Sequence, residues 1–163
     1  MIRLVAKLED NDIIKDGNVT WGALVVLAAK PHQDGVPWED FKWMLCVSYR
    51  RLNQLTKPFA FPIPRCDDAV EDIDTEAKYF IVIDLDSGYW QVVAEKEARE
   101  KLDFFTPDGK KRWKVMPMGA LNSASTVVAM MMELQRQWQA LMEDRGIVDC
   151  GSKVIVDNVL VYG

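Results

Sequence analysis

Near the end of the chain, the segment SKVIVDNVLVYG at 152–163 places a polar pair between two runs of β-branched residues. β-Branched side chains favour extended backbone, whereas Asp and Asn both favour turns. The pattern predicts a β-hairpin that carries Asp157 at its turn. Taken alone, the Asp157–Asn158 pair is equally compatible with a plain turn that has no chemical role.

A second strand, upstream of this hairpin, also ends in an aspartate. In YFIVIDLDSGYWQV, the mostly apolar run Tyr79–Asp84 ends at Asp84, and the strand is expected to stop before Gly88. Two aspartates at the ends of adjacent buried strands can hold divalent ions for phosphoryl transfer, because such ions prefer carboxylate oxygens. The two segments together predict a sheet that carries metal ligands at one end.

The composition of the chain limits what it can bind. Its 20 Lys and Arg against 25 Asp and Glu give a net charge of −5, whereas binding to a phosphate backbone needs arrayed cations. We therefore expect nucleic-acid binding to be disfavoured, although a catalytic face can be locally basic. With 163 residues, 49% of them hydrophobic, the chain can bury a core as one compact domain of two lobes.

The apolar runs and the cysteines of the sequence indicate which cellular compartment to expect. No apolar run is long enough to span a membrane, and no apolar core follows Met1–Leu8, so we expect neither a span nor a secretory signal. Cys46, Cys66 and Cys150 form an odd set without metal-type spacing. We expect reduced thiols in an intracellular, reducing compartment. His32 is the only histidine, which excludes a His-based zinc site.

Local patterns predict a mixture of strands and helices. A long helix is expected from 122 to about 144, with Asn122 or Ser123 as its cap. Its apolar stripe is expected to lie in the core and comprises Val127, Met131, Leu134, Trp138 and Leu141. Asp108–Gly109 predicts a hairpin between strands at 102–105 and 113–116. Further strands are expected at 25–29, 44–47 and 79–84, and short helices at 64–73 and 86–92.

These segments resemble, in order, the reverse transcriptase (RNA-directed DNA polymerase) of gypsy-like long-terminal-repeat retrotransposons. IIKDGNVTWGALVVLAAK is similar to the opening fingers strand, and WMLCVSYRRLNQLT is similar to the block that follows it. FPIPRCDDAVEDI, IDLDSGYWQV and KLDFFTPDGKKRWKVMPMGALNSAST match the next blocks, and VIVDNVLVYG lies where the family has its aspartate pair. The resemblance covers about 13–163.

The resemblance implies an α+β fold of fingers and palm, in which helices back an antiparallel palm sheet. Within a single domain over 1–163, residues 13–60 are expected to form the fingers and 61–163 the palm with part of the fingers. The family's thumb, which grips template and primer, has no counterpart in the sequence. The last edge and the primer face of the palm are therefore expected to stand open unless another chain covers them.

By the same resemblance, Asp84 and Asp157 are the catalytic metal ligands, and the Leu85 carbonyl assists them. The family's third carboxylate falls on Asn158, whose amide oxygen can coordinate an ion but brings no negative charge. No cofactor is expected, and Mg²⁺ is the expected ion if any activity remains.

The resemblance also assigns nucleotide-binding positions to Lys30, Tyr89 and Met118. The arginine with which the family clamps the triphosphate falls on Met44. Methionine cannot make a charge-assisted bidentate contact with phosphate, so this part of the site is expected to be degenerate as well.

These departures lead to three hypotheses. The first is a reverse-transcriptase-derived domain, descended from an RNA-directed DNA polymerase, that is catalytically inactive and is retained as a structural or interaction subunit with a protein partner in a larger complex. The second is a fragment of a working polymerase that extends primers by a two-metal mechanism. The third is an RNA or hybrid binder without catalysis.

Overall fold

The computed structural model describes residues 1–163 except 19, 32–33, 38–39, 148–149 and 157. The chain forms two compact units, each with a β-sheet of its own. Unit 1 consists of Met1–Lys57 and Tyr89–Leu121, and unit 2 consists of Pro58–Gly88 and Asn122–Gly163. The chain therefore leaves unit 1, returns to it and ends in unit 2. In the part of the chain that the structure describes, no helix is both long and apolar enough to cross a membrane.

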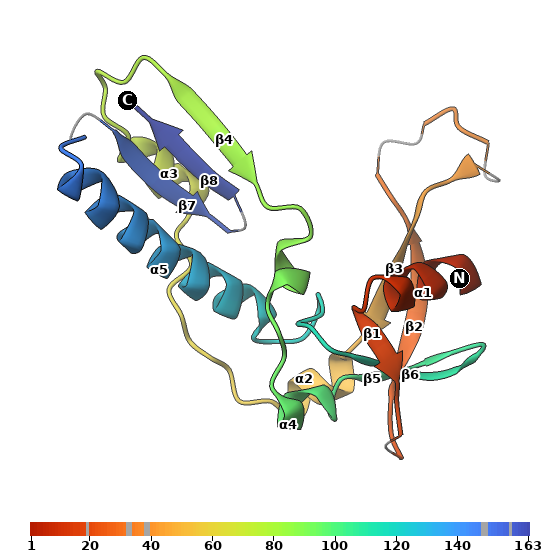
Figure 1. Cartoon of the computed structure of the whole chain (residues 1–163). Coiled ribbons are helices and arrows are strands. Elements are labelled where there is room, and N and C mark those ends of the chain that lie inside the picture. The colour runs from red at the N-terminus through yellow and green to blue at the C-terminus, as the bar shows by residue number, and fades with distance from the viewer. Residues whose placement is uncertain (19, 32–33, 38–39, 148–149, 157) are drawn as a thin grey trace. The chain divides into compact units, whose positions relative to one another are not determined.

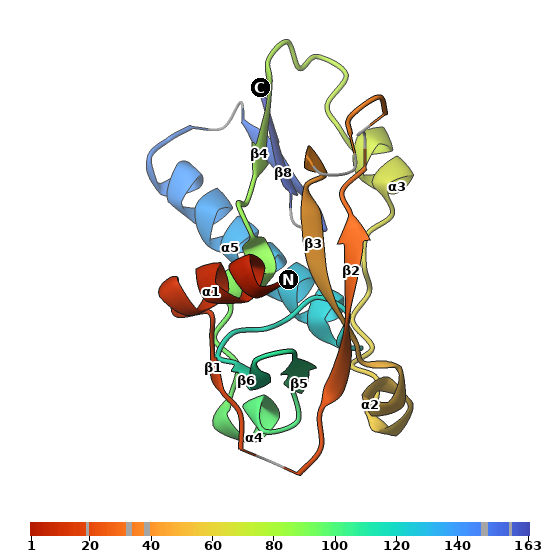
Figure 2. The same cartoon turned by 90° about the vertical axis from the view of Figure 1, so that its right-hand side faces the viewer.

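Unit 1 is built on a five-stranded sheet. Its strands are β1 (Ile14–Asp16), β2 (Ala23–Ala29), β3 (Trp43–Ser48), β5 (Asp103–Thr106) and β6 (Gly109–Trp113). Their order across the sheet is β1-β6-β5-β2-β3, and every pair is antiparallel except β2 with β5 (Figure 2). The predicted hairpin at Asp108–Gly109 is confirmed as β5 and β6, although its second strand begins at Gly109 rather than near 113.

Three α-helices accompany this sheet in the described part of unit 1. The helix α1 (Ile2–Asp10), which the sequence patterns did not predict, buries Val5 and Leu8 on one face. Two helices are shorter: α2 (Arg50–Leu55) follows β3, and α4 (Lys96–Arg99) precedes β5. In the core of unit 1, the buried face of α1 packs with a group of mostly apolar side chains: Ile14, Tyr49, Ala94, Leu102, Phe104, Trp113 and Val115.

A buried ion pair joins the two strands of the β5–β6 hairpin, and its arginine also bonds to the segment after β1. Arg112 Nε donates to Asp103 Oδ1 at 2.5 Å, Nη2 donates to Asp103 Oδ2 at 3.1 Å, and Nη2 also donates to Asn18 Oδ1 at 2.9 Å. The hydrogen bonds to Asp103 raise the pKa of the Arg112 guanidinium. A Cβ on Gly17 would lie 2.6 Å from Asp103 Oδ2, so a side chain at this position would disturb the pair.

Unit 2 is built on a three-stranded antiparallel sheet. Its strands, in order across the sheet, are β4 (Phe80–Asp84), β8 (Asn158–Tyr162) and β7 (Gly151–Ile155), so that β4 and β7 form its edges (Figure 1). The hairpin predicted at 152–163 is confirmed as β7 and β8. The strand β4 is followed by a single 3-10 turn, η2 (Gly88–Gln91), where a short helix was expected.

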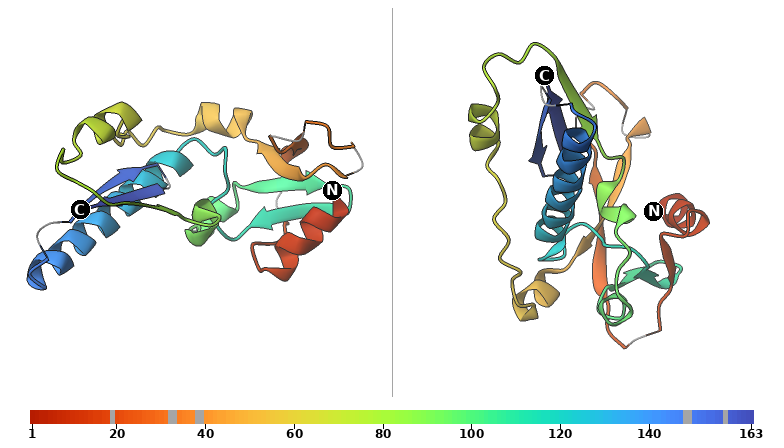
Figure 3. Two further views of the ribbon diagram at one scale, coloured as in Figure 1. Left: turned by 90° about the horizontal axis from the view of Figure 1, so that it is seen from above. Right: turned by 60° about the vertical axis from the view of Figure 1, so that its left-hand side comes forward.

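Two helices pack against this sheet on its β7 side. The long helix α5 (Ser123–Asp144) confirms the helix predicted from 122 to about 144. It contacts β7, as does the short helix α3 (Cys66–Glu71) (Figure 3). Gln135 Nε2 donates to Ser152 O at 2.5 Å, and Lys153 Nζ pairs with Asp72 Oδ2 at 3.0 Å. The strand β4 lies at the opposite edge and receives no such cover in the described part of unit 2.

The start of α5 is held in a way that the sequence did not reveal. Asn122 occupies the N-cap position, but its side chain makes no capping hydrogen bond. Its Oδ1 instead accepts a hydrogen bond from the Phe59 N–H at 2.9 Å. The prediction of Asn122 or Ser123 as the cap is thus confirmed for the position of Asn122 and wrong for its side chain, because the extended segment at the start of unit 2 takes the oxygen that would have capped the helix.

The apolar stripe of α5 is buried only in its first half. Val127 and Met131 are buried, whereas Leu134 is 50% and Leu141 is 44% exposed. The helix has 22 residues and is about 33 Å long. The strand that contacts it has 5 residues and is about 17 Å long, so it cannot cover the whole stripe. The prediction that the stripe lies in the core is right for Val127 and Met131 and wrong for Leu134 and Leu141, while Trp138 is half-buried.

Unit 1 should lose stability at alkaline pH because of Tyr49. The Tyr49 hydroxyl donates to the Leu102 carbonyl at 2.9 Å, and burial of the phenol raises its pKa well above the usual 10.0. Above pH 10 the unfolded chain releases this proton and the folded chain keeps it, so stability falls as pH rises. The expected loss is about 1.4 kcal/mol per pH unit, measured by urea unfolding between pH 8 and pH 12.

Two tyrosine variants separate this effect from general alkaline damage. Tyr49→Phe should lower the free energy of unfolding by about 1 kcal/mol at pH 8 and flatten its decline above pH 10. Tyr79→Phe, at a tyrosine that is 75% exposed, should change neither quantity. An unchanged alkaline slope in Tyr49→Phe would contradict the assignment.

Candidate active site

The pairing of β4 with β8 places Asp84 directly opposite Asn158. Tyr79 and Gly163 exchange two backbone hydrogen bonds, of 2.9 and 3.2 Å, at the far end of the same ladder. Because hydrogen-bonded and non-hydrogen-bonded pairs alternate along an antiparallel ladder, Asp84 and Asn158 form a non-hydrogen-bonded pair. Side chains are closest in such pairs, so the structure brings the Asp84 carboxylate and the Asn158 amide to one face of the sheet.

The turn that leads into Asn158 is tight and strained. Ile155 pairs with Asn158, and Val156 lies in the turn between these two residues. Val156 has a φ of 59°. This left-handed conformation is rare for a β-branched residue and costs about 1–3 kcal/mol. Asp157, the second expected metal ligand, lies outside the described residues.

Beyond Asp84 the chain turns sharply, and the turn uses the Leu85 carbonyl. This carbonyl accepts a hydrogen bond from the Gly88 N–H at 3.2 Å, and Ser87 has a φ of 53°. Asp84 itself is exposed at the end of its strand. A carbonyl oxygen has two lone pairs, so the Leu85 oxygen keeps one that could coordinate an ion, as the sequence prediction requires.

Of the predicted metal ligands and the position of the third carboxylate, the described residues supply one charged oxygen donor group. Asp84 supplies one carboxylate, Asn158 a neutral amide oxygen and Leu85 one carbonyl lone pair. Two-metal sites hold both ions with several anionic oxygens, which balance the charge of the metals. Within the described ranges, no group of three or more His, Cys, Asp or Glu side chains could share a metal ion.

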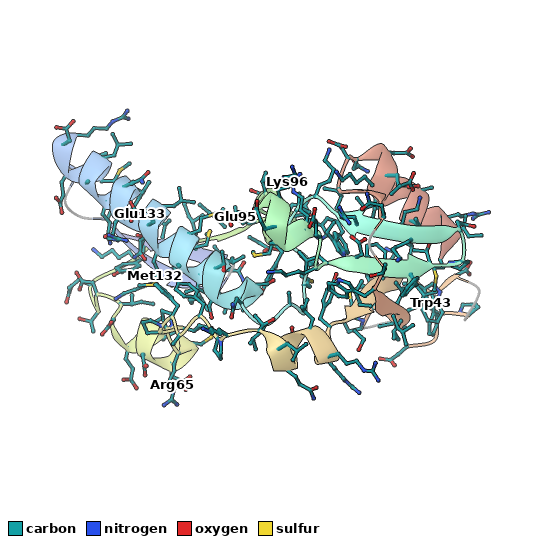
Figure 4. All side chains as sticks on the ribbon, turned by 90° about the horizontal axis from the view of Figure 1, so that it is seen from below. Trp43, Arg65, Glu95, Lys96, Met132 and Glu133 are labelled. Carbon is teal, nitrogen blue, oxygen red and sulfur yellow. The ribbon has the colours of Figure 1, made fainter. Side chains whose placement is uncertain are left out.

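The residues expected to bind a nucleotide all belong to unit 1. Lys30 follows β2, and its N–H donates to Lys42 O at 2.8 Å. Met44 lies on β3 next to Trp43, pairs with Ala28 of β2 and is 39% exposed (Figure 4). Met118 is 59% exposed in the segment that precedes α5, and Tyr89 is half-buried at the start of the return into unit 1.

The segment around Met118 is held by Asn53, a residue that sequence reasoning did not single out. Asn53 Nδ2 donates to Gly119 O at 2.9 Å, and Leu121 N–H donates to Asn53 Oδ1 at 2.9 Å. Gly119 has a φ of 86°, and a Cβ there would lie 3.5 Å from Val47 O. The available signal was an asparagine inside a short helix, where this residue type is disfavoured unless its amide bonds elsewhere.

The sequence between 38 and 162 matches the family model described as "Reverse transcriptase (RNA-dependent DNA polymerase)". The chain belongs to the reverse transcriptase family. It is 31% identical over 165 residues to the "Retrovirus-related Pol polyprotein from transposon 412" of Drosophila melanogaster, covering 98% of this chain and 13% of that protein. It is 37% identical over 118 residues to the "RNA-directed DNA polymerase homolog" of Oenothera berteroana, covering 72% of this chain and 76% of that protein.

Solved structures show that the fold is that of a reverse transcriptase. The foamy viral protease-reverse transcriptase in complex with dsDNA superposes with a TM-score of 0.78 at 17% identity, covering 98% of this chain and 29% of that one. A selenomethionine-labelled mutant of the prototype foamy virus protein gives a TM-score of 0.77 at 20% identity, with 98% and 19% coverage. The predicted α+β reverse-transcriptase fold and the gypsy-like resemblance are thereby confirmed.

The strained turn of this reverse-transcriptase-like chain should be open to stabilisation. Val156→Asn places a residue that tolerates the left-handed conformation at a φ of 59°. We expect the free energy of unfolding to rise by about 1 kcal/mol, measured by urea denaturation. Val156→Ile, which keeps the β-branch, should give no gain, and equal stability of the two variants would argue against strain at this turn.

Removal of the Asn53 amide should release the segment around Met118. Asn53→Ala deletes both hydrogen bonds and is expected to cost about 1–2 kcal/mol of stability. Hydrogen exchange should show faster exchange of the Leu121 amide. Gln54→Ala, at the exposed next position of α2, is the matched control and should leave that amide protected. Unchanged exchange in Asn53→Ala would show that other contacts hold the segment.

Proposed function

We propose that this chain is a reverse-transcriptase-derived domain that lacks polymerase activity and serves as a structural or interaction subunit of a larger assembly. The observation that carries the proposal is the pairing of Asp84 with Asn158. By the family resemblance, a carboxylate belongs where this amide stands. The backbone ladder is intact at this position, so the change lies in the charge of the site and leaves the sheet unaltered.

The loss of one anion weighs heavily on a two-metal site. The protein ligands must compete with water for each dication, and the affinity for such ions depends on the number of charged ligands. An amide oxygen at Asn158 contributes no charge, and the Leu85 carbonyl already accepts a hydrogen bond. The ion that activates the primer hydroxyl would be affected most, because that step needs a strongly bound metal.

The expected triphosphate contact is weakened independently. Met44 lies exposed on β3 and offers a thioether in place of a guanidinium. One basic group elsewhere is engaged: Arg65 projects from the start of α3, and its Nη2 lies 3.8 Å from Asp67 Oδ2 (Figure 4). With a net charge of −5, the chain carries fewer cationic than anionic side chains, which disfavours binding to a phosphate backbone.

Exposed apolar surface supports the proposal that the chain binds a protein partner. In unit 2, Leu134 and Leu141 are exposed on α5, and the apolar strand β4 is exposed along its whole length. Unit 1 adds Leu24 and Val26 on β2, which are 69% and 55% exposed. An exposed apolar run such as that of β4 typically marks an interface between proteins. The free thiols of the cysteines favour an intracellular, reducing compartment for such an assembly.

Polymerase activity is the second candidate, and family membership favours it. Relatives include proteins named as Pol polyproteins and as an RNA-directed DNA polymerase homolog. In that case Mg²⁺ would bind at Asp84 and Asp157, and activity would need those residues. Binding of RNA or a hybrid without catalysis is the third candidate, and the acidic composition argues against it.

Primer extension and ion binding test the proposal directly. We expect no extension of a DNA primer on an RNA template at saturating Mg²⁺ and nucleotides, because the ligand set is incomplete. Asn158→Asp should raise Mn²⁺ affinity about tenfold or more in calorimetry, since it restores one charge. Asn158→Ala is the control and should not raise it. Mg²⁺-dependent extension by the unaltered chain that Asp84→Ala abolishes would establish the polymerase instead.

A further inference from the structure

The helix α1, which lies against β1 in unit 1, carries its acidic side chains at the unfavourable end of a helix (Figure 2). Glu9 and Asp10 are its last two residues, and Asp12 follows shortly after. The free carbonyl groups at a helix C-terminus carry negative partial charge, so carboxylates there destabilise an isolated helix. A helix of 9 residues is also too short to be stable alone in water. The existence of α1 therefore depends on its contacts with the rest of unit 1.

The turn that ends α1 is a second unfavourable feature. Asp12 N–H donates to Glu9 O and Ile13 N–H donates to Leu8 O, both at 2.9 Å, which together form a Schellman motif. The residue in the Asp12 position of this motif adopts a left-handed conformation and is usually glycine. Asp12 has a φ of 58°, a conformation that aspartate tolerates at a cost which glycine avoids. This cost disappears when α1 melts.

Two lysines compensate the carboxylates at this end of the helix. Lys111 Nζ, on β6, lies 2.5 Å from Glu9 Oε1 and 2.8 Å from Asp16 Oδ1. Lys114 Nζ, just after β6, pairs with Asp12 Oδ2. Hydrogen bonds to Asp16 and Glu9 raise the pKa of Lys111, so its side chain, which is 11% exposed, remains charged. Its pair with Glu9 is less screened by water than a pair on the surface.

The apolar contacts of α1 are few. Val5 and Leu8 are its buried residues, at 2% and 8% exposure, and they pack into the core of unit 1. Their burial favours the docked helix. The loss of conformational entropy in nine ordered residues opposes it, as do the carboxylates at the helix end and the left-handed turn. Because these contributions oppose one another, the two lysine pairs weigh heavily in the balance.

We propose that α1 docks and melts as one unit, and that the pairs Lys111–Glu9 and Lys114–Asp12 hold it in the docked state. High ionic strength screens both pairs and shifts the helix toward the melted state. Melting uncovers the part of the core that Val5 and Leu8 cover in the docked state. The inference concerns unit 1 alone, so it stands or falls independently of whether the chain has polymerase activity.

The strand β1 remains paired when α1 melts, because its contacts do not involve the helix. Gly17 N–H donates to Lys110 O at 3.0 Å. Hydrogen-bonded pairs alternate along an antiparallel ladder, so Lys15 and Arg112 form the next such pair. Arg112 also bonds to Asn18 through its side chain. The backbone amide of Arg112 therefore reports on the sheet, whereas an amide within α1 reports on the helix.

Residue-resolved hydrogen exchange of the whole chain tests the inference. We expect the Leu8 amide to exchange faster than the Arg112 amide, because the helix opens without the sheet. Glu9→Gln removes one ion pair and should speed exchange at Leu8 about fivefold, with no change at Arg112. Asp10→Asn is the matched control, since the Asp10 carboxylate has no ion pair among the described residues. It removes a charge from the same turn and should not speed exchange at Leu8.

A second variant and salt test whether the two pairs hold one opening event. Asp12→Asn keeps a residue that tolerates the left-handed turn and removes the charge that pairs with Lys114. The two pairs share no residue, so the fold-changes at Leu8 should multiply in the double variant with Glu9→Gln. Raising the salt from about 0.05 M to about 1 M should speed exchange at Leu8 about tenfold in the unaltered chain and far less in the double variant.

The possible results separate the inference from its alternatives. Faster exchange at Leu8 in Glu9→Gln but not in Asp10→Asn, with a salt effect that the double variant loses, supports it. Equal exchange rates at Leu8 and Arg112 that shift together in Glu9→Gln overturn it, because α1 would then open only with the whole unit. An effect of Asp10→Asn as large as that of Glu9→Gln also overturns it, since net charge would be the cause. So does exchange at Leu8 that salt leaves unchanged in the unaltered chain.

Discussion

The antiparallel ladder between β4 and β8 decides most of what unit 2 can do. Its register puts Asp84 opposite Asn158, so the chemistry at the end of the sheet depends on that one pairing. A shift by one residue would move every side chain of β4 to the other face. The same alternation turns the backbone groups of Phe80, Val82 and Asp84 outward. The position of the candidate site and the outward backbone groups of β4 are therefore two consequences of one hydrogen-bonding pattern.

Unit 1 depends in a comparable way on the segment between β3 and the end of α2. Tyr49 bonds to the Leu102 carbonyl, and Asn53 bonds to both Gly119 and Leu121. These contacts reach the middle and the end of Tyr89–Leu121, the part of the chain that returns from unit 2. The returning part is also held by the buried Arg112–Asp103 pair within its own hairpin. Side chains bonded to backbone carbonyls and amides thus join two stretches that lie far apart in sequence.

The fold can persist while its catalytic ligands change, because the two depend on different groups. Backbone hydrogen bonds and apolar packing hold the sheets, and neither uses the side chain of Asn158 or Met44. This explains how a chain with 17–20% identity to foamy virus proteins keeps a TM-score of 0.77–0.78. Metal and phosphate binding do not tolerate such substitutions, because they depend on the charge of a few side chains.

The sequence by itself determined the elements whose signals are local. The β-branched runs of the last hairpin, the Asp108–Gly109 turn and the long helix were all visible in it, as was the order of blocks that identifies the family. Where a side chain had to choose between partners, sequence reasoning failed. Asn122 bonds to Phe59, and Leu134 and Leu141 face solvent on a helix that is longer than its supporting strand. Only the tertiary structure decided the pairing of Asp84 with Asn158, the hold of Asn53 on its segment and the exposure of β4. Each depends on contacts between residues distant in the chain, and local propensity carries no information about such contacts.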